Sequence, residues 1–160
     1  MSSKTFLQSM AVLQVALIGG ITLFFIIVVS GIVDIGAEAP DKPFSDPLIL
    51  LAPMVAIGGI MGQLMLHKSR ISQMNINNSL ASKLMDYRST YIISWALLEG
   101  PALFAMVVSL VTNYKPVLFI YVVMLVMMGR LRPTLEKLLE EVPLTMEEQA
   151  KISDPDGIVM

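Results

Sequence analysis

Four long apolar runs dominate the 160-residue sequence and restrict the folds that it can adopt. Hydrophobic residues make up 55% of the chain and its mean hydropathy is +0.72, more than a soluble domain needs to build a core. A helix takes about 20 apolar residues to cross a bilayer, and the runs do not alternate polar and apolar residues as a membrane barrel does. The sequence therefore predicts an all-α integral membrane bundle of four transmembrane helices, at about residues 10–33, 48–66, 91–111 and 117–131.

The positions of lysine and arginine predict the orientation of these spans. Basic residues collect on the cytoplasmic side of membrane helices, and one side carries Lys4, Lys68, Arg70, Lys83, Arg88, Arg130 and Arg132. Only Lys42 and Lys115 lie on the other side. We therefore expect both termini in the cytoplasm and a multi-pass protein of the bacterial inner (cytoplasmic) membrane. Residues 1–132 are the expected transmembrane domain, and residues 133–160 a cytoplasmic amphipathic helix with a flexible tail.

The connections between the spans carry turn and capping signals. Residues 34–47 hold acidic residues and three prolines, as an irregular external loop does. Residues 67–90 form the large cytoplasmic loop, in which Asn78 or Ser79 is expected to cap a helix that runs into the third span. Residues 113–116 form a tight external turn, which makes the third and fourth spans antiparallel neighbours.

The C-terminal segment has the pattern of an amphipathic helix. Pro133 is expected in its first turn, and helical spacing places an apolar stripe opposite an acidic face, the stripe being Leu135, Leu138, Leu139 and Val142. The stripe either lies on the membrane surface, meets a partner or packs on the cytoplasmic loop, and the acidic face favours protein contact over anionic lipid. Thr145 and Glu148 form a capping box that begins a further short helix.

One carboxyl group, that of Glu99, lies inside the third apolar run. It is about 8 residues, or about 12 Å at helical rise, from the edge of that run. A charged residue at this depth is unfavourable by about 2.5 to 3.5 kcal/mol, so it is normally protonated, paired or functional. Gly100 and Pro101 follow directly, and a proline inside a helix frees the carbonyl four residues earlier and favours a kink.

Three more polar residues are expected at the depth of Glu99. Counting from the span edges places Gln14, Gln63 and Arg130 at about 8 to 12 Å from the cytoplasmic edge, as for Glu99. One interpretation is that Glu99 binds a proton, with Gln63 or a freed carbonyl accepting its hydrogen. A second is a buried ion pair between Glu99 and Arg130, and a third is a small-molecule or lipid-headgroup site.

Glycines and an internal similarity bear on how the helices pack. Gly58, Gly59 and Gly62 are expected either to let another helix approach closely or to form an oligomer contact. Residues 16–30 resemble residues 96–109, which indicates that the chain is two copies of one helical hairpin.

Several classes of function have no support in the sequence. The chain has no cysteine and a single histidine, His67, so we expect no metal site. A net charge of −2 carries no nucleic-acid signature. No nucleophile and base pair and no phosphate loop is present, so we expect no enzyme and no cofactor.

Residues 53–112 resemble the proteolipid hairpin of rotary ATPases, the c or K subunit. The similarity is carried by residues 58–63 (GGIMGQ), a polar loop with a basic residue before the next span, and residues 96–104 (ALLEGPALF). The resemblance implies that Glu99 is an ion-carrying carboxylate with Gln63 as its polar neighbour. Because Gly100 and Pro101 stand where sodium-binding members usually carry a hydroxyl residue, it implies a proton rather than sodium. The whole chain is also similar to small uncharacterised four-helix bacterial membrane proteins.

Two functions follow from these observations. The first is a proteolipid-like, non-enzymatic membrane protein in which Glu99 is a protonatable site, acting within a homo-oligomer or with other membrane protein subunits. The second is a structural accessory subunit, in which Glu99 pairs with Arg130 and the C-terminal helix docks a partner. In both, membrane lipids surround the bundle.

Overall fold

The computed structural model describes residues 2–33, 38–41 and 43–154, and these residues confirm the predicted all-α class. The elements are α1 (Ser3–Ser30), η1 (Pro43–Ser45), α2 (Pro47–Ser72), α3 (Leu80–Thr112), η2 (Lys115–Leu118), α4 (Phe119–Arg130), α5 (Leu135–Glu141) and α6 (Met146–Ser153). Three of them, α1, α2 and α3, are long and apolar enough to cross a membrane. A fourth crossing is counted if residues 115–141 form one span, bent by 79° between α4 and α5.

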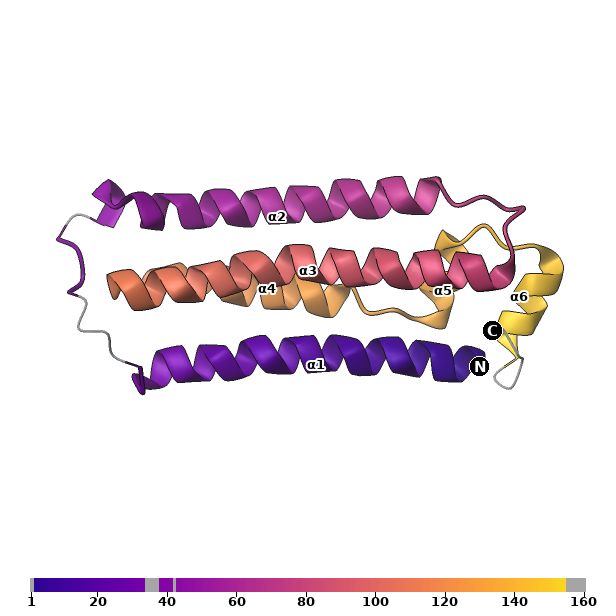
Figure 1. Cartoon of the computed structure of the whole chain (residues 1–160), viewed down its shortest axis with the longest axis horizontal. Helices are drawn as coiled ribbons and strands as arrows, with labels where there is room; N and C mark the ends of the chain where they lie inside the picture. Colours follow the sequence, from indigo (N-terminus) through magenta and orange to yellow (C-terminus); the bar gives the residue numbers. More distant parts are fainter. Residues whose placement is uncertain (1, 34–37, 42, 155–160) are drawn as a thin grey trace.

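The long helices run side by side, and the two short C-terminal helices gather at one end of the bundle (Figure 1). We call this the capped end: α1 and α3 begin there and α2 ends there, while α4 runs towards it, stops short and is followed by α5 and α6, which cover it. The predicted side-by-side packing of α3 and α4 is confirmed, since Asn113 ends α3 in a left-handed conformation and η2 leads directly into α4.

Helix α3 is the centre of the bundle. It packs on α1, α2 and α4. Of the 18 most apolar consecutive residues in each helix, 50% are buried in α3, against 17% in α1 and 22% in α2. Its buried face carries three aromatic rings one helical turn apart, Tyr87, Tyr91 and Trp95, which meet in a tilted and an edge-to-face contact. The outer faces of α1 and α2 are apolar and exposed, as at Val15 and Met61, which suits a hydrocarbon surrounding.

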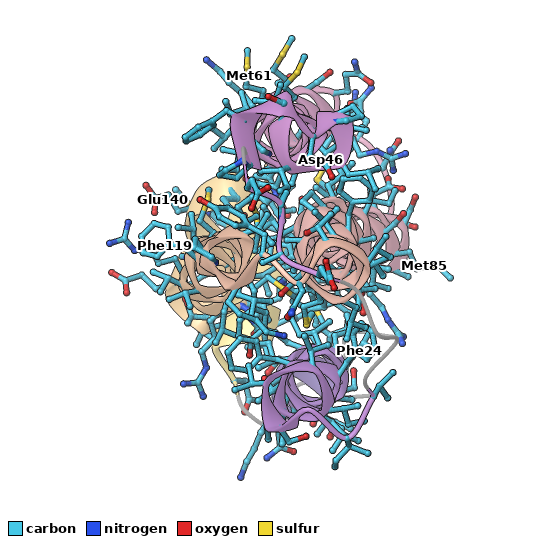
Figure 2. All side chains as sticks on the ribbon, turned by 90° about the vertical axis from the view of Figure 1, so that its left-hand side faces the viewer. Phe24, Asp46, Met61, Met85, Phe119 and Glu140 are labelled. Atoms are coloured by element: carbon cyan, nitrogen blue, oxygen red, sulfur yellow. The ribbon has the colours of Figure 1, made fainter. Side chains whose placement is uncertain are left out.

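The first two helices do not form the packed hairpin that the internal similarity indicated. Viewed along the bundle, α1 and α2 lie on opposite sides of the α3 and α4 pair (Figure 2). The second half of the chain does form such a pair. The matching segments are mostly apolar, and apolar similarity alone does not specify which helices pack together.

Helices α1, α2 and α3 extend past the predicted spans. Helix α1 begins at Ser3, and the predicted loop 67–90 shortens to residues 73–79 because α2 continues to Ser72 and α3 begins at Leu80. Ser79 caps α3, as predicted, with its hydroxyl accepting from the N–H of Ser82. Polar ends with caps continue a helix beyond the hydrocarbon, which a hydropathy count does not register. The loop predicted to be external is described only at residues 38–41 and 43–46, so Asp34 lies outside the described residues.

The C-terminal helices pack on the chain's own bundle. Leu138, Val142, Leu144 and Ile152 are buried in the main hydrophobic core. Pro133 was expected in the first turn of this helix, but it precedes the helix, because Thr134 is the N-cap and accepts from the N–H of Lys137. The capping box of Thr145 and Glu148 is present as predicted. The structure thus covers Leu138 and Val142 of the apolar stripe within one chain, while Leu139 is partly buried and Leu135 stays exposed.

Candidate functional site

Glu99 is half-buried on α3, and within the described residues its carboxyl has no hydrogen bond or ion pair. Residues two apart on a helix face away from each other, and Pro101, two positions further on, packs against Gly59 of α2. Glu99 therefore points away from α2 and from Gln63, which is on that helix. The carboxyl lies on the outer flank of the central helix.

Gly59 is where α2 and α3 approach most closely among the described glycines. A Cβ there would lie 2.5 Å from Cγ of Pro101 and 2.6 Å from the carbonyl oxygen of Leu97. That oxygen is the one that Pro101 leaves without its helical N–H partner, so it packs on Gly59 rather than accepting from Glu99. Gly58 and Gly100 face open space, and a Cβ at Gly62 would make only an ordinary contact, at 4.0 Å from the Leu97 side chain.

The side chain of Gln14, on α1, reaches the end of α4. Its Nε2 donates to the carbonyl of Met128 at 2.6 Å. The last carbonyls of a helix have no intrahelical partner, and here the bend between α4 and α5 receives two more side-chain donors. Trp95 Nε1 donates to Leu131 O at 3.2 Å, and Lys137 Nζ to Arg130 O at 2.8 Å. Side chains of α1, α3 and α5 thus donate to the backbone carbonyls where the helix is interrupted between α4 and α5.

A polar cluster at the capped end was not anticipated. We call it the His67 cluster, and it consists of His67, Tyr91, Ser94 and Glu141. The ring of His67 has Nδ1 at 3.2 Å from Ser94 Oγ and Nε2 at 3.6 Å from Glu141 Oε1. Tyr91 donates its hydroxyl to Glu141 Oε2 at 3.2 Å. The sequence held one signal for this: Glu141 is three residues from Leu138, so it flanks the buried stripe.

A cleft of about 490 Å³ opens between α2, α4 and α5 beside this cluster. Its polar lining is Gln63, His67, Lys68, Arg130 and Glu141, and its apolar lining is Leu64, Met127 and Leu131. Gln63 and Arg130, which the depth count expected in one cluster with Gln14 and Glu99, both line the cleft. Neither Gln14 nor Glu99 lines it, and the described residues contain no ion pair between Glu99 and Arg130.

Helix α6 and the residue that follows it are hydrogen-bonded to the first turns of α3 and α1. The side chain of Lys83 is fully buried and donates to Glu148 Oε2 at 2.7 Å. Ser3 donates its hydroxyl to the carbonyl of Asp154 at 2.9 Å.

Among the described residues no group of three or more His, Cys, Asp or Glu is placed to hold a metal ion.

Comparison with known proteins finds none that is similar to this chain. A scan against protein-family models finds no match for this chain, and searches of curated proteins and of solved structures find none.

Proposed function

We propose that the chain is a small, non-enzymatic membrane protein of four spans that works within an oligomer or a larger complex of the bacterial inner membrane. Glu99 is its functional carboxyl, and it either binds a proton or meets a polar group of a neighbouring subunit. Both termini, with α5 and α6, lie in the cytoplasm in this proposal.

The observation that supports this proposal is the position of Glu99. The carboxyl is half-buried on the central helix, between Leu98 and Gly100, and has no partner among the described residues. A carboxylate exposed to hydrocarbon is unfavourable by several kcal/mol, about 2.5 or more. It is therefore protonated, or it is paired with a group from outside the chain.

Carbodiimide labelling in native membranes tests the proton-binding form. The reagent modifies protonated carboxyl groups in apolar surroundings, so mass spectrometry of the labelled peptide is expected to find modification at Glu99 that falls as pH rises. Glu99→Gln removes the site, and labelling of this peptide should then be absent.

Crosslinking tests the oligomer. The chain has no cysteine, so single cysteines report without background. Ala96→Cys and Leu103→Cys lie one turn from Glu99 on its side of α3, and they are expected to crosslink to a second copy or another subunit. Met54→Cys, exposed on α2, is the control and should stay monomeric.

The alternative is a structural accessory subunit that binds no ion. The observation in its favour is the number of side chains that fix α5 and α6 to the bundle, among them Lys83, Glu148 and Glu141. Glu99 that resists carbodiimide at every pH, together with absent crosslinks at Ala96→Cys and Leu103→Cys, would favour this alternative.

A further inference from the structure

The cleft beside the His67 cluster is lined by two cations that form no ion pair within the described chain. Lys68 and Arg130 both line it, and neither side chain has a hydrogen bond or ion pair among the described residues. The one carboxylate in the lining, Glu141, already interacts with His67 and with the hydroxyl of Tyr91. The cleft is therefore suited to an anion, provided that the anion lies nearer to Lys68 and Arg130 than to Glu141.

Each of the two cations ends an apolar row along its helix. On α2, the positions Ile57, Met61 and Leu64 lead at helical spacing to Lys68, and the first three are more than half exposed. On α4, a row at the same spacing leads to Arg130 and consists of Ile120, Val123 and Met127, which are partly buried. Leu64 and Met127 line the cleft itself. An occupant with an anionic head and an apolar tail would match both parts.

In the proposed orientation the capped end lies on the cytoplasmic side of the membrane, and this location selects among anions. Basic pockets between transmembrane helices on the cytoplasmic side are the usual sites of anionic lipid headgroups. A volume of about 490 Å³ falls in the range of small-molecule sites. A free phosphate would use the two cations but leave the exposed apolar row on α2 uncovered.

We propose that this cleft binds the phosphate headgroup of an anionic glycerophospholipid, with Lys68 and Arg130 contacting the phosphate and the rows on α2 and α4 contacting an acyl chain. This inference rests on the proposed orientation, with the capped end in the cytoplasm, but the site is separate from Glu99, so it stands whether or not Glu99 binds a proton.

Native mass spectrometry of the full chain tests the site with two lipids of identical acyl chains, phosphatidylglycerol and phosphatidylcholine. The wild-type protein is expected to retain phosphatidylglycerol in preference. Lys68→Gln and Arg130→Gln are each expected to lower this preference about fivefold, since a basic residue at an anionic surface contributes about 1 kcal/mol. The matched control is Arg132→Gln, which removes the same charge two residues away, outside the cleft lining, and should leave the preference unchanged.

A second variant works in the opposite direction. Glu141→Gln removes the negative charge from the cleft while its amide oxygen still accepts from Tyr91, so retention of phosphatidylglycerol should rise. A gain of binding cannot result from unfolding, which separates the site from a loss of structure.

Three results would overturn the proposal. The first is equal retention of the two lipids by the wild-type protein. The second is a loss in Arg132→Gln as large as in Arg130→Gln, which would reduce the effect to general surface charge. The third is displacement of phosphatidylglycerol by millimolar glycerol 3-phosphate, which would make the cleft a site for a soluble phosphate.

Discussion

The ammonium group of Lys83 lies 2.7 Å from the carboxylate of Glu148, and it joins the first turn of α3 to the first turn of α6. The Lys83 side chain is 0% exposed and that of Glu148 15% exposed. Glu148 also accepts from the backbone N–H of Thr145 in the capping box. The carboxylate of Glu148 thus takes part in the N-terminal cap of α6 and also compensates the buried charge of Lys83.

Glu148→Gln is expected to lower the free energy of unfolding by about 3 kcal/mol, because removing one partner of a buried pair leaves the other charge uncompensated. The measurement is denaturant unfolding in mixed micelles. Lys83→Met combined with Glu148→Gln should recover most of the loss, since no lone charge remains. Glu147→Gln, at an exposed neighbouring position, should behave as wild type. Failure of the double variant to recover would mean that the loss in Glu148→Gln does not come from an uncompensated charge on Lys83.

The same pair predicts how acid affects α6. Burial alone raises the pKa of the Glu148 carboxyl, but the hydrogen bond from Lys83, the backbone N–H of Thr145 and the charge of Lys83 outweigh it and hold the pKa below its ordinary value near 4.5. The contribution of Glu148 to stability is therefore fully present above that ordinary value and is lost as pH falls through the lower pKa of the folded state. Hydrogen exchange of the α6 amides, corrected for intrinsic rates, should increase over that interval. In Glu148→Gln the increase should be absent.

Gly59→Ala is expected to destabilise the bundle by about 1 to 3 kcal/mol, because its Cβ would meet the ring of Pro101 and a backbone oxygen. Neither of these can move without shifting α2 away from α3. Gly58→Ala is the matched control: its Cβ would meet nothing within 4 Å, so the free energy of unfolding should stay equal or rise. Equal effects of the two variants would contradict the close approach at Gly59.

Gln14→Leu is expected to lower the free energy of unfolding by about 1 kcal/mol, the usual contribution of a hydrogen bond between membrane helices. The variant leaves the carbonyl of Met128 without its side-chain donor. Gln8→Leu, on the exposed side of the same helix, should have little effect. Faster hydrogen exchange at the bend between α4 and α5 in Gln14→Leu alone would locate the change there.

Local signals in the sequence predicted local structure well. The cap at Ser79, the capping box of Thr145 and Glu148 and the tight turn after Asn113 each depend on a few neighbouring residues, and each is present. The packing of α3 with α4 follows from the shortness of that turn. These features need no knowledge of what surrounds them.

The arrangement of the polar residues was harder to predict because depth does not determine direction. Counting helical rise gave similar depths for Glu99 and Arg130, but the direction of Glu99 is set by Pro101, which faces α2. The amphipathic pattern of α5 showed which face is apolar, yet not that the bundle itself covers it. Glu141 therefore was predicted on an acidic outer face, whereas it contacts His67 and Tyr91.

The separation of α1 from α2 constrains the order of assembly during synthesis. Gln14 donates to a carbonyl 114 residues further along the chain, and a ribosome needs roughly ten seconds to add that many residues. The surface that receives α1 is built from α3 and α4, so it does not exist while α1 leaves the insertion machinery. The first helix made therefore waits for the third and fourth before it can pack, and until then the amide of Gln14 lacks the carbonyl to which it donates in the folded chain.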